Sequence, residues 1–262
     1  MTDETHRFDG LADVYARYRP RYPSELVVRL REERGLPSGA HVADVGCGTG
    51  RLAEAFLEQG CRVTGIEPSA PMRAQAVDRL ANRPGFACLA GSAEATGLPD
   101  ACVDAIVAGQ AFHWFDAPRA GREFRRVLRP GGWVALVWNE RHDLSQPFLA
   151  AYEALIHVHS PEYHERLSDA YGGARALAFF GGEERRDPGA VRLLVLPNPQ
   201  QLDWDGLQGR TASASYIPKA GPGREALFAS LRALFEEHAR DGHVEFLLHT
   251  IAYHGTLERA GP

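Results

Sequence analysis

The chain has 262 residues, of which 44% are hydrophobic and 24% charged, a composition typical of a globular protein. Its 29 basic and 34 acidic residues give a net charge of -5, which disfavours a large nucleic-acid partner. No run of about 18 apolar residues is present, so the sequence predicts no membrane-spanning helix. The segment 1–10 is polar and lacks the apolar stretch of a secretory signal, and we therefore expect a cytoplasmic protein.

Along the first half of the chain, helical and strand patterns alternate. A helical run opens at Pro23 and closes at Gly35, and further helices are expected after the glycine loop 46–50, after a cap at Ser69 and from Pro118. Short apolar runs between them predict strands at 41–45, 62–66, 86–90, 103–108 and 133–138. This β-α-β rhythm predicts an α/β fold with a doubly wound parallel sheet, which binds ligands at the carboxyl ends of its strands.

The second half of the chain has a different pattern. Residues 146–180 read as helices, with a cap at Ser160, and more helices are expected at 203–212 and 222–240. A strand is predicted at 191–196, before a turn rich in Pro, Asn and Gln, and a final strand at 244–253. The four cysteines, at 47, 61, 88 and 102, have no zinc-ligand or C-x-x-C spacing, so free thiols are expected.

The loop after the first predicted strand belongs to the segment V-A-D-V-G-C-G-T-G, in which Asp44 precedes three glycines. Glycines let the backbone approach a ligand closely, and the N–H groups of the next helix start attract electron-rich atoms. Glu67 follows the second predicted strand, 23 residues beyond Asp44, near the spacing at which a carboxylate binds ribose hydroxyls. The segment G-S-A-E at 91–94 follows the third strand. The alternative interpretation is a solvated acid at Glu67 and glycines that serve packing alone.

Together with the later L-R-P-G-G-W segment, these motifs resemble class I S-adenosylmethionine-dependent methyltransferases over residues 38–140. The resemblance implies a Rossmann-like, seven-stranded sheet in the order 3-2-1-4-5-7-6, with strand 7 antiparallel and helical insertions after strands 5 and 6. It also implies one methyltransferase domain over 1–262. Within it, 1–37 would form an N-terminal helical lid, 38–140 the cofactor-binding half, and 141–262 the substrate roof with strands 6 and 7.

The same resemblance implies S-adenosyl-L-methionine as the cofactor and S-adenosyl-L-homocysteine as the product. Glu67 would bind both ribose hydroxyls, and Tyr18 and Arg19 would close over the cofactor. The other implied cofactor contacts are Asp44, Gly46, Cys47, Gly48, Gly50, Pro68, Met72, Ser92, Ala93, Glu94 and Gln110.

Four further segments are similar to methyltransferases related to trans-aconitate methyltransferase. They are A-R-Y-R-P-R-Y-P near the N-terminus, Q-A-F-H-W-F-D after strand four, V-W-N-E-R after strand five, and S-Y-I-P at 215–218. Members of that group methylate small molecules, often at oxygen. The resemblance therefore favours O-methylation of a carboxylate or hydroxyl, with N-methylation as the other option.

The residues at the ends of strands four and five are candidates for catalysis and substrate binding. His113 is the leading general-base candidate, and its alternative role is to shape the loop. For an anionic substrate, Arg141 or Arg210 is the preferred clamp. The substrate-binding candidates are Trp114, Asn139, Arg141, His142, Arg210 and Tyr216.

Two other functions compete with methyl transfer. A nicotinamide-dependent Rossmann oxidoreductase is opposed by the Asp before the glycine loop and by the G-S-A-E segment. A non-catalytic cofactor-binding protein is opposed by the intact Asp44 and Glu67. Histidines at 157, 159 and 164 do not share one helix face, so no metal is expected. The sequence leaves the acceptor and the oligomeric state undetermined.

Overall fold

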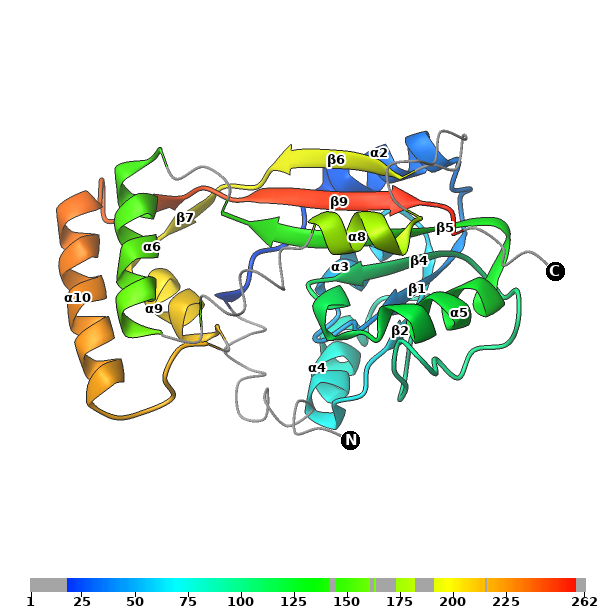
Figure 1. The fold of residues 1–262 in the computed structure, drawn as a ribbon, viewed down its shortest axis with the longest axis horizontal. Helices are drawn as coiled ribbons and strands as arrows, with labels where there is room; N and C mark the ends of the chain where they lie inside the picture. Colours follow the sequence, from blue (N-terminus) through cyan, green and yellow to red (C-terminus); the bar gives the residue numbers. More distant parts are fainter. Residues whose placement is uncertain are drawn as a thin grey trace.

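The computed structural model describes residues 18–141, 145–160, 163, 173–181, 191–214 and 216–257. Seven strands form one sheet in the order β3-β2-β1-β4-β5-β9-β6 (Figure 1). Their bounds are β1 His41–Val45, β2 Arg62–Ile66, β3 Phe86–Leu89, β4 Val103–Gly109, β5 Leu128–Glu140, β6 Arg192–Pro197 and β9 His249–Gly255. The strand order predicted from the resemblance is thereby confirmed, since β6 and β9 are the sixth and seventh strands of this sheet.

Only one strand of the seven-stranded sheet, as described, runs against the others. β9 pairs antiparallel with both β5 and β6, while the remaining pairs are parallel. β1 and β4 are buried along almost their whole length, which fits their continuous apolar sequences because a parallel sheet is covered on both faces.

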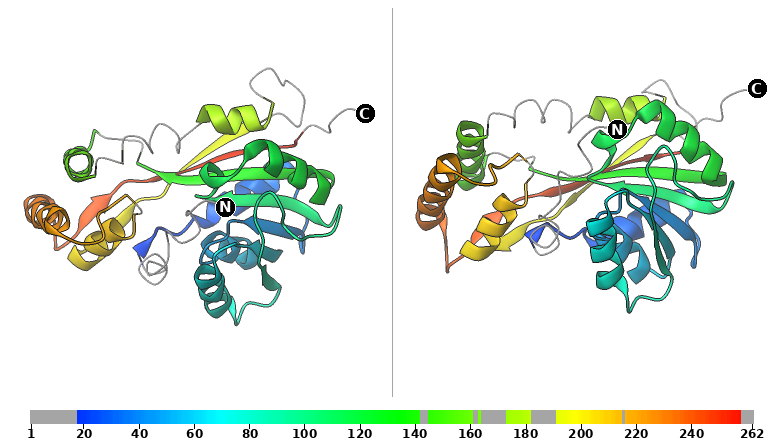
Figure 2. Two further views of the ribbon diagram at one scale, coloured as in Figure 1. Left: turned by 60° about the horizontal axis from the view of Figure 1, so that its bottom comes forward. Right: turned by 90° about the horizontal axis from the view of Figure 1, so that it is seen from below.

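Helices cover both faces of the sheet. On one face, Leu26 of α2 (Ser24–Arg34) and Phe56 of α3 (Arg51–Glu58) belong to one buried cluster, to which α4 (Ala70–Leu80) adds its last residue. On the other face, Phe124 of α5 (Ala117–Val127) and Ala176 of α8 (Gly173–Phe179) belong to a second cluster. Figure 2 shows these two layers with the sheet between them. Burial of these apolar faces is the main stabilising contribution that holds the layers together.

A third group of elements lies beyond the carboxyl ends of β5 and β6, and we call it the helical lobe (Figure 1). It contains α6 (Pro147–His159), α9 (Trp204–Ala212) and α10 (Pro222–His238), with a hairpin of β7 (Gln200–Leu202) and β8 (Val244–Phe246). Its own buried cluster includes Phe148, Tyr152, Leu207, Leu231 and Phe246. The lobe therefore has a core separate from the two that flank the main sheet.

The prediction of one strand at 244–253 is wrong. The segment divides into β8, which pairs with β7 in the helical lobe, and β9, which joins the main sheet. Leu248 between them is buried in the lobe's core, and its carbonyl accepts the Asn198 N–H at 2.7 Å. An apolar run shows no break where its pairing partner changes, so the sequence pattern did not reveal the division. The predicted turn near residue 200 likewise contains a strand, β7.

The helix caps differ in part from prediction. Ser69 precedes α4 but its side chain makes no cap hydrogen bond. Asp116 caps α5, because its Oδ1 accepts the Arg119 N–H at 3.0 Å. Most of the helix predicted from Ser160 to residue 172 lies outside the described residues. No helix among the described residues has the length and apolar character needed to cross a membrane.

Candidate functional site

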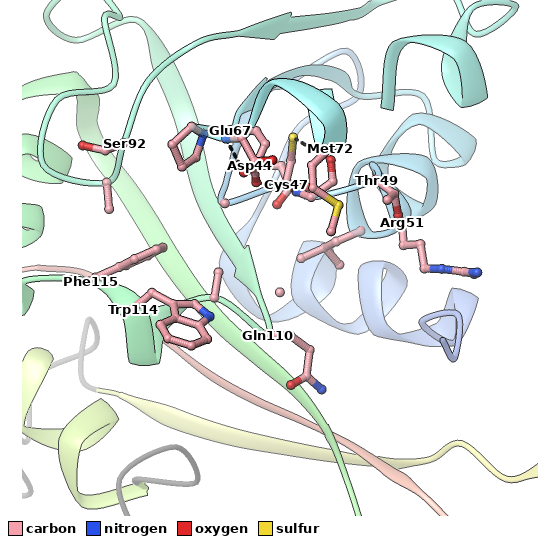
Figure 3. Close-up of a pocket in the computed structure, with 18 of the residues that line it drawn as sticks. Asp44, Cys47, Thr49, Arg51, Glu67, Met72, Ser92, Gln110, Trp114 and Phe115 are labelled. Atoms are coloured by element: carbon pink, nitrogen blue, oxygen red, sulfur yellow. Dashed lines mark hydrogen bonds between the residues drawn. The ribbon is translucent and has the colours of Figure 1, made fainter. Parts of the chain in front are cut away.

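A cavity of about 530 Å³ opens where β1, β2, β4 and β5 end. This volume falls within the range of about 300–1,000 Å³ typical of small-molecule sites. The location agrees with the rule that doubly wound sheets bind ligands outside the carboxyl ends of their strands. Figure 3 shows the cavity, with Glu67 and Met72 on one side and Trp114 and Phe115 opposite.

The glycine loop brings backbone to the cavity without side chains in the way. Gly46 has a φ of 68°, and a Cβ there would lie 2.7 Å from the Cβ of Ala111. Only glycine fits both this left-handed backbone and this close approach. The Gly48 N–H donates to Glu67 Oε2 at 2.9 Å, which ties the loop to the end of β2.

Asp44, at the penultimate position of β1, is fully buried and lines the cavity. Its Oδ2 accepts the Ala53 N–H at 3.0 Å from α3, whereas its Oδ1 has no hydrogen-bond partner among the described residues. Burial raises the pKa of the Asp44 carboxyl to about 8, against the opposing effect of the Ala53 N–H. A buried acceptor without a partner is costly, so this oxygen is suited to bind a cation or a donor from a ligand.

Glu67 directly follows β2, and both of its oxygens already accept backbone N–H groups. Oε1 binds the Ser69 N–H and Oε2 the Gly48 N–H, each at 2.9 Å. Burial raises the pKa of Glu67, although these two N–H groups act in the opposite direction. Because each carboxylate oxygen can accept more than one hydrogen bond, the side chain is held in place and can still bind two hydroxyls.

The far end of the cavity is formed by a tight turn after β3. Ser92 and Ala95 form an isolated bridge, and the Glu94 carboxylate accepts the Asp116 N–H at 2.9 Å. This bond ties the turn to the start of α5. The turn therefore presents the backbone and side chains of Ser92, Ala93 and Glu94 to the cavity.

Gln110 follows β4 with a φ of 56°, in the left-handed region that is uncommon for residues other than glycine. Its backbone N–H donates to the Val137 carbonyl at 2.8 Å, and its side-chain Nε2 to the Asn139 carbonyl at 3.1 Å. These bonds fix the amide at the rim between β4 and β5. Backbone strain held at such a position is a common feature of ligand-binding sites.

The structure brings most of the sequence-predicted site residues to one cavity. The predicted residues that line it are Arg19, Asp44, Gly46, Cys47, Gly48, Glu67, Pro68, Met72, Ser92, Ala93, Glu94, Gln110, Trp114, Asn139 and Arg210. Arg19 and Arg210 approach from the N-terminal segment and from α9, which lie far from the glycine loop in sequence.

Five predicted residues are not among the described residues that line the cavity. Gly50 packs on α4, where its Cβ would lie 2.8 Å from Leu80, and Tyr18 lines a neighbouring groove. The other three are His113, Arg141 and Tyr216. His142 lies outside the described residues.

These positions have local causes. The backbone carbonyl of His113 accepts a hydrogen bond from Arg175, and its ring lies 4.7 Å from that of Trp114, which does face the cavity. Arg141 forms an ion pair with Glu153 at 2.9 Å. The Tyr216 ring packs 4.7 Å from that of Tyr163.

Sequence reasoning missed several described residues that also line the cavity. Two had a readable signal, because Thr49 lies inside the glycine loop and Asp116 is a helix cap two residues before Pro118. The other residues have no sequence pattern typical of a ligand-binding residue, and only the tertiary structure shows that they line the cavity. They are Pro20, Tyr22, Arg51, Leu52, Ser69, Gly109, Ala111, Phe115 and Arg119.

Residues 43–136, which contain the glycine loop, Glu67 and the turn after β3, match the family model described as a methyltransferase domain. This segment is a methyltransferase domain. It agrees with the class of enzyme that the sequence motifs resemble, and it covers the strands β2 to β4 and most of β1 and β5.

Relatives of the methyltransferase domain occur in several bacteria. An uncharacterized methyltransferase of Mycobacterium tuberculosis is 41% identical over 143 residues, which cover 54% of this chain and 55% of the relative. A malonyl-[acyl-carrier protein] O-methyltransferase of Pectobacterium atrosepticum is 40% identical over 100 residues, covering 37% of this chain and 38% of the relative. At most, then, the chain spans about half the length of these two curated relatives.

Similarity in structure extends beyond the methyltransferase domain. A solved structure from Anaeromyxobacter dehalogenans, of a protein whose name describes a type II methyltransferase, is 27% identical to this chain, with a TM-score of 0.64. The match covers 92% of this chain and 100% of that one. The part of the chain that follows the methyltransferase domain therefore has a counterpart in a known structure.

Proposed function

We propose that this protein is an S-adenosylmethionine-dependent methyltransferase that acts on a small-molecule acceptor. The observation that carries the proposal is the pair of buried carboxylates, Asp44 and Glu67, which end adjacent strands and face one cavity within the methyltransferase domain. A cation and a ribose diol are the two ligand groups that such a pair fits.

The residues that line the cavity suit the chemical groups of S-adenosylmethionine. The unpartnered Oδ1 of Asp44 suits the cationic amino group of the methionyl part, beside the backbone of Gly46 and Gly48. Glu67, held by two backbone N–H groups, suits the ribose hydroxyls. The adenine would lie against Met72 and Pro68, with the turn at 92–94 along its edge.

The bound cofactor would supply a methyl group on a sulfonium, which is its own leaving group. The protein's part is to align the acceptor and to exclude water, and alignment alone can lower a barrier by about 7–11 kcal/mol. The aromatic wall of Trp114 and Phe115 provides exclusion, since Phe115 is buried and Trp114 half-buried. Gln110, whose side-chain Nε2 donates to the Asn139 backbone carbonyl, forms the polar rim together with Asn139.

The acceptor is proposed to be methylated at oxygen, as a carboxylate or hydroxyl. Two facts support this choice: the four segments similar to the trans-aconitate methyltransferase group, and the relative named as an O-methyltransferase. In the same proposal, the helical lobe within 141–262 roofs the acceptor, and the lid expected at 1–37 is limited to the segment before α2, because Leu26, Val27 and Leu30 are buried in the core. Arg210 of α9 supports the roof, because it reaches the cavity from the lobe.

Calorimetric titration with S-adenosylhomocysteine and, separately, with NAD tests the proposed function. We expect binding of S-adenosylhomocysteine and none of NAD. Binding of NAD alone would replace the proposal with an oxidoreductase. Binding of S-adenosylhomocysteine without methyl transfer to any acceptor in a broad small-molecule screen would favour a non-catalytic protein.

The role of His113 as a general base stays a prediction. The structure places it one residue before the cavity-lining Trp114, on the short helix Phe112–Trp114. If His113 accepts the acceptor's proton, His113→Ala lowers turnover by about 10²–10⁴-fold without changing cofactor affinity. Full turnover by the variant would assign His113 to shaping the loop.

A further inference from the structure

Arg210 is a buried cation whose charge is not balanced within the described protein. It lies in the last turn of α9 in the helical lobe, is only 7% exposed, and reaches the wall of the cavity. Among the described residues, its Nε and Nη1 atoms have no hydrogen-bond partner and no carboxylate forms an ion pair with it. Its guanidinium stacks over the ring of Phe246 at 4.5 Å, which supplies packing but no counter-charge.

Burying a charge without a partner is unfavourable, and the titration of Arg210 reflects this. Burial lowers the pKa of Arg210 to about 10, and the neighbouring Arg19 guanidinium acts in the same direction. Arg210 still keeps its proton at neutral pH, since a pKa of 10 lies well above 7. The cavity therefore holds a permanent positive charge from the helical lobe, and Arg19 lines the same cavity.

Arg141, which directly follows β5, gives a comparison for a cation that has a counter-charge within the protein. The Arg141 side chain is 10% exposed, and its guanidinium binds the Glu153 carboxylate and the Tyr163 hydroxyl. The Glu153 carboxylate therefore balances the charge of Arg141, and no ligand anion is required for this. Of the two arginines that the sequence offered as a clamp for an anion, the structure leaves only Arg210 with donors directed at no described acceptor.

We infer that the methyl acceptor carries a carboxylate that binds Arg210, and that this carboxylate is distinct from the group that receives the methyl. The inference rests on the proposed function, because the same cavity must hold the cofactor. Arg210 belongs to α9 in the helical lobe, whereas Asp44 and Glu67 stand at the ends of β1 and β2, and all three line the cavity. Its anion would thus bind beyond the cofactor, in the part of the cavity that the roof covers.

Two physical arguments define the anion. A singly charged carboxylate costs less to desolvate than a doubly charged phosphate, because the solvation energy rises with the square of the charge. An anion paired with a guanidinium is also a weaker nucleophile, so a second functional group of the acceptor must attack the methyl. The acceptor is therefore an acid with a further carboxyl, hydroxyl or amino group. In the transfer, that group's lone pair forms the new bond to the methyl carbon, and the sulfur keeps the electrons of the broken bond. A carboxylate acceptor has no proton to lose, whereas a hydroxyl or amino acceptor releases one proton to water.

Binding of small acids to the protein saturated with S-adenosylhomocysteine tests the inference. The probes are acetate, malonate, citrate and phenylacetate, with the primary amides of the same acids as neutral controls and phenyl phosphate as the phosphate arm. We expect calorimetry to show binding of one or more acids, and of none of the amides. Binding of phenyl phosphate alone would overturn the assignment to a carboxylate, and binding of no anion would overturn the whole inference.

Arg210→Met and Arg224→Met form a matched pair of variants. Arg224 stacks over Phe228 at 4.5 Å, the same distance as in the Arg210 pair, but is not among the described residues that line the cavity. We expect Arg210→Met to weaken acid binding about 10- to 100-fold, as the loss of a charged hydrogen-bond partner does. Arg224→Met should leave it within about twofold. Equal acid affinity in both variants would overturn the inference.

Thermal unfolding separates a ligand-binding arginine from a structural one. Replacing an unbalanced buried cation by an apolar side chain of similar size removes a desolvation cost, so Arg210→Met is expected to raise the Tm of the ligand-free protein. A fall in its Tm would assign Arg210 to the structure of the lobe. Binding of S-adenosylhomocysteine is measured in parallel. If the wild type does not bind it, the proposed function is refuted. If the wild type binds it but binds no acid, only this inference is refuted.

Discussion

The Asp44 carboxyl provides the sharpest test of how the cofactor is bound. Its Oδ1 has no partner among the described residues, and burial raises the pKa of Asp44 to about 8. At pH 7 about one tenth of the ligand-free protein then has Asp44 ionised, and at pH 6 about one hundredth. If Asp44 binds the cationic amino group of S-adenosylhomocysteine, as proposed, it does so in its ionised form. The affinity for S-adenosylhomocysteine should therefore rise about tenfold, or 1.36 kcal/mol, per pH unit from pH 6 towards 8, and then level off.

Asp44→Asn keeps the shape and removes the charge. At pH 8 we expect it to bind S-adenosylhomocysteine more weakly by about 1.5–3 kcal/mol, the contribution of a charged hydrogen bond. Between pH 6 and 8 its affinity should be flat. Glu140, whose pKa burial raises to about 7, titrates in the same range. Only the part of the wild-type slope that disappears in the variant is therefore assigned to Asp44.

The affinity for S-adenosylhomocysteine is measured by calorimetry from pH 6 to 8, with Asp104→Asn as the control. Asp104 pairs with Arg129 at 2.7 Å and is not among the described residues that line the cavity. Its pKa is lowered, since the hydrogen bonds from Arg129 and the His41 N–H together outweigh desolvation. Asp104 thus stays ionised from pH 6 to 8, and the control should keep the wild-type slope. A wild-type affinity that does not change with pH, or a slope that persists in Asp44→Asn, would refute the assignment.

The same substitution should increase stability while it weakens binding. The pKa of Asp44 is about 8 when folded and near 3.8 when unfolded, so over this interval only the unfolded chain releases the proton. The free energy of unfolding therefore falls as pH rises from 4 to 8. Asn cannot ionise, and Asp44→Asn should exceed the wild type in urea stability at pH 8. The advantage should vanish below about pH 4.

Three further substitutions test other parts of the site. Glu67→Gln should weaken S-adenosylhomocysteine binding by about 1.5–3 kcal/mol in calorimetry, and an unchanged affinity would remove Glu67 from the ribose site. Gly46→Ala places a Cβ 2.7 Å from the nearest side chain at a φ of 68°, whereas Gly39→Ala meets open space at a φ of 71°. In urea unfolding, Gly39→Ala should cost about 1–2 kcal/mol and Gly46→Ala clearly more; equal losses would contradict the close approach. Arg141→Met removes the guanidinium that pairs with the partly buried Glu153 carboxylate and should destabilise the protein by about 1–3 kcal/mol, whereas a stabilised variant would show that the ion pair contributes nothing.

The cofactor half of the protein could be predicted from local signals. The glycine loop, Asp44 and Glu67 are each fixed within a few residues of a strand end, and strands of a parallel sheet bring their carboxyl ends to one edge. This is why residues from three separate strand ends were correctly expected to lie together, as the cavity lining shows. Their roles toward the cofactor remain predictions for the experiments above.

The part of the cavity around residues 113–115 and the strands of the C-terminal segment could not be predicted from local signals. His113, Trp114 and Phe115 are consecutive, and the turn of a short helix decides which of them line the cavity. The division of 244–253 between two sheets depends on which strands are available to pair, which no periodicity records.

The sequence by itself determined the α/β class, the strand order implied by its motifs, and the acids that end the strands. Tertiary structure alone decided that Oδ1 of Asp44 has no described partner, and that Arg141 is neutralised by Glu153 while Arg210 faces the cavity without a described counter-charge. The physical reason is that local motifs depend on neighbouring residues, whereas the balance of buried charge depends on groups brought together from distant parts of the chain.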